Sequence, residues 1–475
     1  MCGRQQVLQR SVGVRQVKQI RGVGEDLPRR GSGRRESGTV SHCIGLTGLA
    51  LVLVSWLPVV LARTSTAMPA PARTARDSLS PADRYFRGIP STGHLKLAAA
   101  DRVRMAVRTP DHAAASLGDR RRARARRSEE RTVTIAFAKT SLPIIGAPMA
   151  GGTTTPELTE AVARAGGFPF VAGGYLTAEA LAPLVERMRE ATSHFGVNLF
   201  APNPVPVDRE AFTDFVTALE PSAAARGITL DPEPVEDDDH FDDKLDLLTE
   251  HPVPLVSFTF NLPTAEAVDR LHAVGTQVVA TVTSVAEARA AAEVGVDGLV
   301  VQGPRAGGHS GTADPTREIE DRATVDLVRD ILAEVDLPVA AGGGVDGEAM
   351  VGDLLGAGAS AVVVGTLLLR SDEAGTAPTH RAALAADEFT ETQLTRAFTG
   401  RPARALVNDF VRTFDPIAVD AYPAVHHLTK EFRAAAKKAD DPYSLHLWAG
   451  TGYRSAQEGS AETIVKDLGA GFARE

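Results

Sequence analysis

The sequence predicts a (β/α)8 TIM barrel with an inserted helical segment and additional C-terminal helices. Two observations carry this prediction. From residue 141 onward, apolar segments bounded by Gly or Pro alternate with Ala- and Glu-rich segments of helical spacing, and there are eight such apolar segments. Strands that alternate with helices indicate a parallel sheet, and eight such units favour a closed barrel. An open doubly wound sheet is the alternative, but no GxGxxG follows the first strand.

Each predicted strand is a short run rich in Val, Ile, Phe or Ala. The first strand precedes a helix for which Thr155 is the expected cap, with Pro156 at its first position and Gly166 near its end. A second helix is expected from Thr177 to about Thr192. The eight predicted strands are residues 143–150, 168–174, 195–200, 254–262, 276–282, 295–303, 337–345 and 360–369.

Two regions interrupt or follow this alternation. Residues 201–250 are rich in Pro and acidic residues, and we expect an inserted helical segment that covers the barrel. Their run EDDDH at 236–240 is more typical of a solvated face than of a metal site, because its carboxylates are not spaced as ligands. Residues 371–475 are expected to add helices beyond the barrel.

The first 132 residues differ from the rest in charge. They contain 25 Lys and Arg against 10 Asp and Glu, a net charge of +15. Since the whole chain has a net charge of −9, the remaining residues have a net charge of −24. Residues 43–62 are uncharged and long enough to span a bilayer or to form the apolar part of a signal peptide. Three interpretations stay open: a membrane anchor or export signal, a disordered basic tail, or translated sequence ahead of a true start near Val133, which we favour.

Residues 133–475 form the expected globular body. It contains no cysteine, because Cys2 and Cys43 both lie in the basic part, and this excludes a disulfide, a thiolate metal site or a cysteine nucleophile within it. Its negative charge disfavours nucleic-acid binding. We expect a cytoplasmic protein, and a membrane-anchored or exported one only if residues 1–62 are retained.

The active site of a (β/α)8 barrel lies at the carboxyl ends of its strands. Glycine is concentrated there, with one histidine and neither a metal-ligand cluster nor an evident carboxylate pair. We therefore expect an organic cofactor to supply the chemistry, and no metal. The residues that follow the predicted strands are Pro148 to Gly152, Gly173 and Gly174, Asn198, Thr259 and Asn261, Thr281 and Thr283, Gln302 to His309, Gly342 to Gly344, and Gly365 and Thr366.

Two of these strand ends indicate a phosphate site. The segment AAGGGVDGE places three glycines before a helix that starts near Asp346, and Gly365-Thr366 ends the eighth strand. The loops after the seventh and eighth strands of such barrels commonly bind phosphate through backbone N–H groups.

The segment QGPRAGGHSG, residues 302–311, is the candidate for the chemistry itself. Gln302 ends the sixth strand, and its amide both donates and accepts, which suits a heterocycle with a mixed edge. Gly307 and Gly308 allow the backbone to approach a flat ring closely. A neutral imidazole acts as base or donor near pH 7, so we expect His309 to be catalytic.

The motifs APMAGG, FGVNLF, VSFTF, QGxxAGGHxG, AAGGG and VVVGT resemble, in this order, those of the nitronate monooxygenases, which are FMN-dependent barrels. The resemblance covers about residues 141–455, and HLWAGTGYRSA (446–456) is similar to the family's closing segment near the flavin. It implies that His309 is the catalytic residue. It also implies that the isoalloxazine ring contacts Met149, Asn198, Gln302 and the Gly307 backbone, and that the phosphate lies on Gly344, Val363, Val364, Gly365 and Thr366.

By this resemblance, His309 takes the α-proton of a nitroalkane or hydrogen-bonds a nitronate, and FMN and O2 complete an oxidation to a carbonyl compound and nitrite. The expected partners are thus a small-molecule substrate and O2. Thr259 and Asn261 stand where some members have His and Gly, which leaves the substrate open. Flavin-dependent enoyl-acyl-carrier-protein reductases and NAD(P)H:quinone reductases share many of these motifs and stay alternatives. So does a non-redox phosphosugar lyase or synthase, although the strand ends offer neither a Schiff-base lysine nor a carboxylate.

Overall fold

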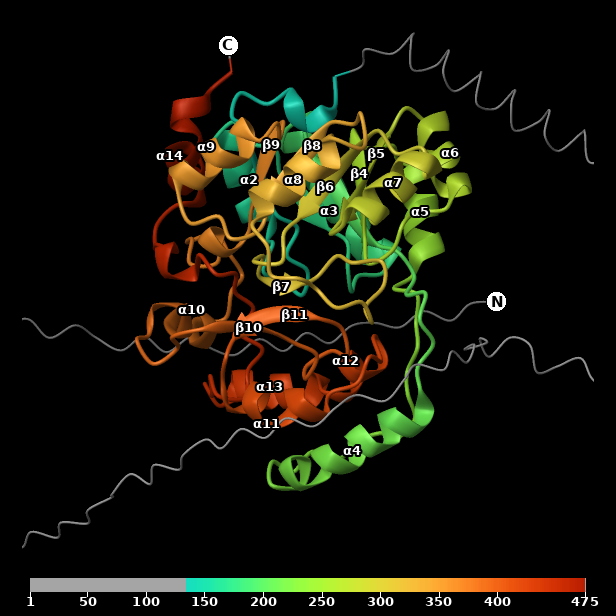
Figure 1. The fold of residues 1–475 in the computed structure, drawn as a ribbon, viewed down its shortest axis with the longest axis vertical. Coiled ribbons are helices and arrows are strands. Elements are labelled where there is room, and N and C mark those ends of the chain that lie inside the picture. Colours follow the sequence, from blue (N-terminus) through green and yellow to red (C-terminus); the bar gives the residue numbers. More distant parts are fainter. Residues whose placement is uncertain (1–133, 475) are drawn as a thin grey trace, which may run out of the picture. The chain divides into compact units, whose positions relative to one another are not determined.

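The computed structural model describes residues 134–474, in which eight parallel strands form the predicted barrel (Figure 1). Their order around the sheet is β1-β9-β8-β6-β5-β4-β3-β2. Hydrogen bonds between β1 and Phe168, just before β2, close the circle, with N of Phe168 donating to O of Ile144 at 2.8 Å. The strands are β1 (Ile144–Gly146), β2 (Phe170–Ala172), β3 (Gly196–Phe200), β4 (Leu255–Thr259), β5 (Gln277–Val282), β6 (Gly298–Gln302), β8 (Val339–Gly342) and β9 (Ala361–Val364).

Helices surround these strands, and several begin at the caps that the sequence indicates. The hydroxyl of Thr155 accepts from N of Leu158, and Thr177 caps the next helix in the same way. The eighth helical position is taken by α14, far along the chain, which packs between α9 and α2. The barrel helices are α2 (Pro156–Arg164), α3 (Ala178–Ala191), α5 (Phe241–Glu250), α6 (Ala265–Ala273), α7 (Val285–Val294), α8 (Thr324–Leu332), α9 (Glu348–Gly356) and α14 (Ala461–Gly469).

The barrel has an inner and an outer apolar core, as the two-residue period of its strands requires. In β5, Val278, Ala280 and Val282 belong to the core between strands and helices, whereas Val279 belongs to the barrel interior. The short helix η2 (Ala136–Ala138) packs into this interior core together with Phe168. The interior is therefore filled by side chains, and space for a ligand exists only toward the strand ends.

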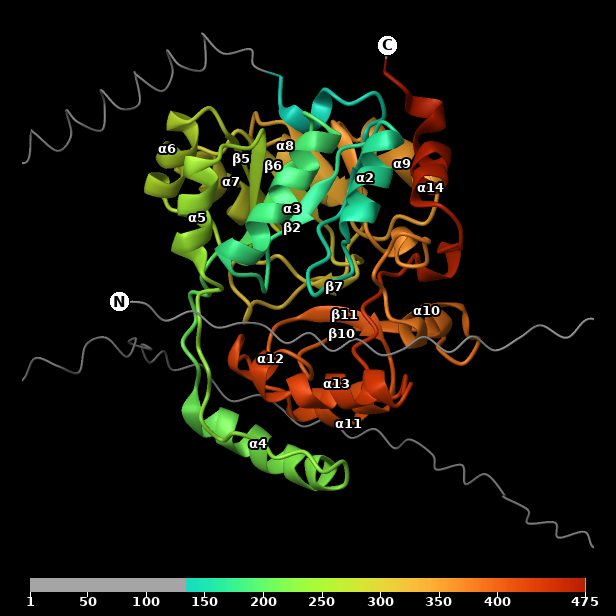
Figure 2. The same cartoon turned by 180° about the vertical axis from the view of Figure 1, so that it is seen from behind.

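The segment 201–250 is helical, but its two helices have different roles. Helix α5 packs against the barrel between α3 and α6. Helix α4 (Arg209–Ala224) instead joins an apolar cluster with α11 (Asp409–Phe414) and α13 (Lys430–Lys438) (Figure 2). The segment is thus helical as expected, but neither helix is an insertion that covers the barrel: α4 packs on the C-terminal helices, and α5 is one of the barrel's own helices.

The C-terminal region contains the expected helices and also a small sheet that the sequence does not predict. Its helices include α10 (Pro378–Ala385), α11, α12 (Ala424–Leu428) and α13. Strands β10 (Thr392–Thr395) and β11 (Ala403–Leu406) pair in antiparallel fashion, and β11 pairs with β7 (Gly308–His309). These strands were missed because they are two to four residues long and form only through pairing across distant segments. The sheet brings the C-terminal region directly onto His309.

No helix within residues 134–474 is long and apolar enough to cross a membrane. The expectations for the basic segment 1–132 and its apolar stretch 43–62 lie outside the described residues.

Candidate active site

The loops that follow β6, β8 and β9 converge at the strand ends with residues 449–452. A Cβ atom added to Gly307 would lie 2.4 Å from N of Gly450 and 2.9 Å from Oγ1 of Thr366. N of Gly450 donates to the same Thr366 oxygen at 3.0 Å, and N of Thr451 donates to O of Arg305 at 3.1 Å. Gly307 is thus needed for close backbone packing, and the structure brings it next to Thr366.

Backbone donors are available where the cofactor phosphate is expected. Within the described part of the chain, the N–H groups of Gly344, Gly365 and Thr366 have no protein acceptor. Gly344 has a φ of +81°, and a Cβ there would lie 3.1 Å from Cβ of Arg305 and 3.2 Å from Oγ1 of Thr451. Free amides grouped at a strand end and the start of a short helix bind phosphate well. These residues therefore fit the phosphate of a flavin nucleotide.

Three other predicted cofactor residues occupy different parts of this region. Met149 lies beside Gly365, because a Cβ on Gly365 would be 3.8 Å from its Sδ. Val363 partly faces the barrel interior. The Val364 side chain is 1% exposed in the outer core, and its carbonyl accepts from N of Ala147, so only its backbone lies near the mouth.

Asn198 belongs to a row of polar groups across the ends of β3, β4 and β5. Its Nδ2 donates to Oγ of Ser257 and to Oγ1 of Thr259, both at 2.9 Å. The Thr259 hydroxyl in turn lies 3.1 Å from that of Thr281. Asn198 is 3% exposed, so this row forms a hydrogen-bonded floor beneath the mouth of the barrel.

The side chain of Gln302 holds the loop that carries the histidine. Its Nε2 donates to O of His309 at 3.0 Å, and its Oε1 accepts from N of Gly311 at 2.7 Å. Both ends of the amide are thus used within the chain. The structure brings Gln302 and His309 together, and the evident role of Gln302 is to fix the backbone around His309.

His309 lies in an aromatic chamber formed mostly by distant segments. Its ring centroid is 5.5 Å from that of Phe260, 6.0 Å from Tyr422 and 5.3 Å from Trp448. Its Nε2 lies 3.0 Å from Oγ1 of Thr399. Phe260 ends the VSFTF motif and Trp448 lies in the closing segment HLWAGTGYRSA, whereas no local pattern marks Tyr422 or Thr399.

Arg401 is a second site residue that the sequence analysis missed. It is fully buried, and its guanidinium donates to backbone carbonyls of Phe260, Ser310 and Thr312 and to Oδ1 of Asn203. It also lies over the Phe260 ring, 4.3 Å from the centroid. No carboxylate forms an ion pair with it among the described residues, and Glu287 and Asp314 act on it only at longer range, so it places a positive charge beside the chamber.

Burial and this charge determine the protonation of His309. Burial, together with the positive charges of Arg401 and Arg433, lowers the pKa of His309 to about 3. Burial also raises the pKa of the Tyr422 hydroxyl well above its usual value. At neutral pH the chamber therefore contains a neutral imidazole, a neutral phenol and a cationic guanidinium.

A buried ion pair supports the loop after β2 at the edge of this chamber. Nζ of the fully buried Lys244 lies 2.6 Å from Oδ2 of Asp239 and donates to O of Gly173 at 3.1 Å. Oδ1 of Asp239 accepts from N of Tyr175, whose φ is +64°. Burial raises the pKa of Asp239 to about 6, against the lowering effect of Lys244. The pair thus holds Tyr175 in a strained conformation, stacked 4.4 Å from the ring of His426.

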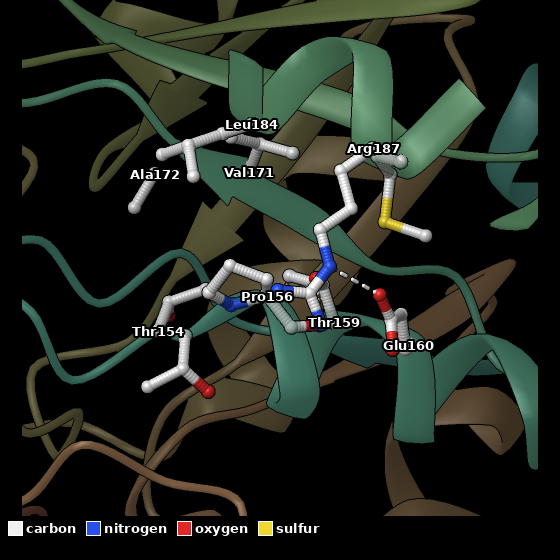
Figure 3. Close-up of a pocket in the computed structure, with 10 residues that line it drawn as sticks. Thr154, Pro156, Thr159, Glu160, Val171, Ala172, Leu184 and Arg187 are labelled. Carbon is white, nitrogen blue, oxygen red and sulfur yellow. Dashed lines mark hydrogen bonds and ion pairs between the residues drawn. The ribbon is translucent and has the colours of Figure 1, made fainter. Parts of the chain in front are cut away.

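Two cavities lie outside the aromatic chamber of His309. Figure 3 shows a pocket in the helical layer between α2 and α3, where Nε of Arg187 binds Oε1 of Glu160 at 2.6 Å. It has neither the free amides nor the histidine, so it is not the candidate site. A polar cavity of about 170 Å³ adjoins the site instead, lined in part by Thr283, Gln302, Pro304, Ser310, Arg317 and Arg322.

The arrangement suits an organic cofactor and a small reactive anion. No cluster of three His, Cys, Asp or Glu side chains within residues 134–474 is placed to hold a metal ion. The glycine loops offer backbone donors, His309 offers an uncharged base, and Arg401 offers a fixed positive field. This chemistry corresponds to oxidation or proton transfer, with the redox group supplied by a cofactor.

Comparison with known proteins identifies the family. The family model for nitronate monooxygenase matches residues 131–471. A probable nitronate monooxygenase of Staphylococcus aureus (strain Newman) is 32% identical over 69% of this chain and 93% of its own length. One from Staphylococcus saprophyticus is 33% identical over the same shares.

Solved structures agree with these matches. The structure described as nitroalkane oxidase from Streptomyces ansochromogenes has 43% identity and a TM-score of 0.67, covering 70% of this chain and 95% of that chain. FabK from Thermotoga maritima has 23% identity and a TM-score of 0.55, covering 71% and 94%, and shows likeness of fold alone. The chain therefore belongs to the nitronate monooxygenase family of TIM-barrel oxidoreductases.

Proposed function

We propose that this chain is an FMN-dependent oxidase of nitroalkanes and alkyl nitronates that uses O2 and forms a carbonyl compound and nitrite. The observation that carries the proposal is the neutral His309 beside the buried cation Arg401, at the mouth of a glycine-lined barrel. Family membership and the match to a nitroalkane oxidase support it. The free amides of Gly344, Gly365 and Thr366 support a flavin mononucleotide rather than a phosphate-free flavin.

The residues of the chain perform the proton and charge steps. Bound FMN supplies the electron-accepting centre and the route to oxygen. His309 removes the α-proton of a neutral nitroalkane, and the resulting nitronate carries its negative charge next to Arg401. The positive charge that lowers the pKa of His309 disfavours the protonated imidazole, but it also stabilises the anionic nitronate. The two effects oppose each other, so the charge changes the free energy of the proton transfer from substrate to His309 only a little. Phe260, Tyr422 and Trp448 restrict water around the reacting carbon.

Anaerobic reduction of the flavin tests this proposal. The purified full chain, loaded with FMN, is mixed without oxygen with an alkyl nitronate or with NAD(P)H while the flavin absorbance is followed. We expect bleaching by the nitronate and none by NAD(P)H. Bleaching by NAD(P)H alone would instead support a reductase, and a chain that cannot retain FMN would contradict the flavin assignment.

The role of His309 is tested with the variant His309→Asn. We expect the variant to retain FMN, because His309 lies outside the expected phosphate loops. Turnover of neutral nitroalkane should fall by orders of magnitude, since a general base contributes about 10²- to 10⁴-fold. Turnover of a preformed nitronate should fall far less, because no carbon-bound proton has to be removed. Loss of the flavin would show that His309 is structural.

A further inference from the structure

We propose that Thr399 is a positioning residue that holds His309 in the tautomer protonated on Nε2, so that Nδ1 is the atom that removes the substrate proton. The inference rests on the proposed oxidation of nitroalkanes and adds to it a residue and a specific atom. It is carried by the hydrogen bonds of Thr399, by the fixed orientation of the His309 ring, and by the surroundings of Nδ1.

The Thr399 hydroxyl has two possible partners and one proton to donate. Its Oγ1 lies 3.0 Å from Nε2 of His309 and 3.3 Å from O of Arg401. A carbonyl oxygen can only accept, whereas an imidazole nitrogen either donates or accepts according to its tautomer. If the hydroxyl proton points to O of Arg401, Nε2 of His309 must carry a proton and donate to Thr399.

The carbonyl of Arg401 decides between the two arrangements. Among the described residues, the Thr399 hydroxyl is the one donor to this oxygen, and Arg401 is fully buried. Turning the hydroxyl toward His309 would leave a buried carbonyl without a donor, which costs roughly as much as a lost hydrogen bond. It would also place the imidazole proton on Nδ1, for which no acceptor lies within the described part of the chain. The opposite arrangement satisfies both Arg401 and Nε2.

The backbone around Thr399 keeps the hydroxyl in place. N of Gly400 donates to O of Arg396 at 2.8 Å, and N of Ala421 donates to O of Gly400 at 3.1 Å. Gly400 has a φ of +71°, and a Cβ there would lie 2.7 Å from the carbonyl carbon of Ala421. Thr399 itself is 1% exposed. The hydroxyl is therefore presented from a tight, buried turn, not from a flexible loop.

The ring of His309 is held as firmly as the hydroxyl. His309 pairs with Ala403 in the small sheet, and the His309 carbonyl accepts a hydrogen bond from Nε2 of Gln302. Phe260 and Trp448 pack against the ring with centroids at 5.5 and 5.3 Å. Since rotation of the ring is restricted, the two nitrogens have fixed and different surroundings.

Nδ1 is the nitrogen that is left for the substrate. Among the described residues, no group forms a hydrogen bond with it. Nδ1 of His446 is fully enclosed and has no partner, whereas Nδ1 of His309 is not wholly enclosed by the protein. In the tautomer set by Thr399, Nδ1 of His309 is unprotonated. The same tautomer gives Nδ1 no proton to donate to a nitronate. His309 therefore contributes to the reaction of neutral nitroalkanes far more than to that of nitronates.

The test compares Thr399→Val with Thr399→Ser, using full-chain protein loaded with FMN. Valine has nearly the shape of threonine but no hydroxyl, and serine restores the hydroxyl. For Thr399→Val we expect kcat/KM for a neutral nitroalkane such as nitroethane to fall about tenfold or more, the effect of losing one buried hydrogen bond. For the preformed nitronate of the same compound, kcat/KM should change less than about twofold on the same scale. Thr399→Ser should recover most of the nitroalkane activity.

The possible outcomes separate this inference from the proposed function. Equal losses on both substrates, or no loss on either, would overturn the role of Thr399 while leaving the proposed oxidation intact. A wild-type protein that oxidises neither substrate would contradict the proposed function itself.

Nitrogen NMR of protein labelled on its histidine imidazoles gives a second, activity-free measurement, with His309→Asn used for assignment. We expect the His309 proton on Nε2 in the wild type, and a proton on Nδ1 would overturn the inference even if Thr399→Val fails to fold.

Discussion

Lowering the pH from 7 to 5 is expected to destabilise the folded chain, because several histidines are buried in their neutral form. Burial lowers the pKa of His309 to about 3, of His380 to about 4 and of His426 to about 2. Burial also lowers the pKa of His446 well below its usual value of 6.5. His380 is the simplest case, since it is 8% exposed and its Nε2 donates to O of Trp448 at 3.0 Å.

The sign follows from where the protons bind. Each histidine has a lower pKa in the folded than in the unfolded chain, so at intermediate pH the unfolded chain binds more protons. Lowering the pH therefore stabilises the unfolded chain relative to the folded one. The stabilisation is complete above about pH 6.5 and is lost as the pH falls toward the folded pKa. For His380 the full effect is about 3 kcal/mol, of which about 2 kcal/mol is lost between pH 7 and 5. Asp239 acts in the opposite direction, because its folded pKa of about 6 exceeds its usual 3.8, and it offsets about 1 kcal/mol.

Urea unfolding of the full chain at pH 7, 6 and 5, followed by far-UV circular dichroism and tryptophan fluorescence, measures this loss. His309, His380 and His426 should each lose about 2 kcal/mol and Asp239 offsets about 1 kcal/mol, so the free energy of unfolding should fall by about 5 kcal/mol, and His446 adds to this fall. A fall of this size is comparable with the whole stability of many proteins. The variant His380→Gln keeps a donor for O of Trp448 but cannot titrate, so its fall should be about 2 kcal/mol smaller. A wild-type free energy that changes by less than about 1 kcal/mol between pH 7 and 5 would refute the reasoning.

Two further substitutions test the support of the site. Gly307→Ala should lower the FMN content of purified protein severalfold, because its Cβ would lie 2.4 Å from N of Gly450, whereas Gly356→Ala, with no atom within 4 Å, should leave FMN content unchanged. Equal FMN content in both variants would contradict a close-packed loop. Lys244→Met should reduce the free energy of unfolding by about 3 kcal/mol at pH 7, because it leaves Asp239 buried without its partner. The reduction should shrink at pH 5, where Asp239 is protonated. The control variant Lys466→Met, which removes a surface ion pair, should cost about 0.5 kcal/mol or less. A loss for Lys244→Met that does not depend on pH would argue against the ion pair as the cause.

Much of the barrel could be predicted from the sequence, because its evidence is local. The apolar run of each strand, as in Val278 to Val282, and caps such as Thr155 are read within a few neighbouring residues. The same holds for the glycine-rich strand ends and for His309, which the barrel geometry assigns to one mouth. The small sheet of β7, β10 and β11 could not be found in this way, since two to four residues form a strand only when a distant partner is present.

The sequence by itself determined that the chain forms an eight-stranded barrel and that a glycine-lined site with one histidine lies at its mouth. The tertiary structure alone decided what surrounds that histidine. Thr399 and Arg401 lie about 90 residues along the chain from the groups they contact near His309, and no local pattern relates them. Whether His309 is charged, and which of its nitrogens carries the proton, depends on burial and on hydrogen bonds across that separation. These are properties of the packed chamber, because desolvation and charge act through space and not along the chain.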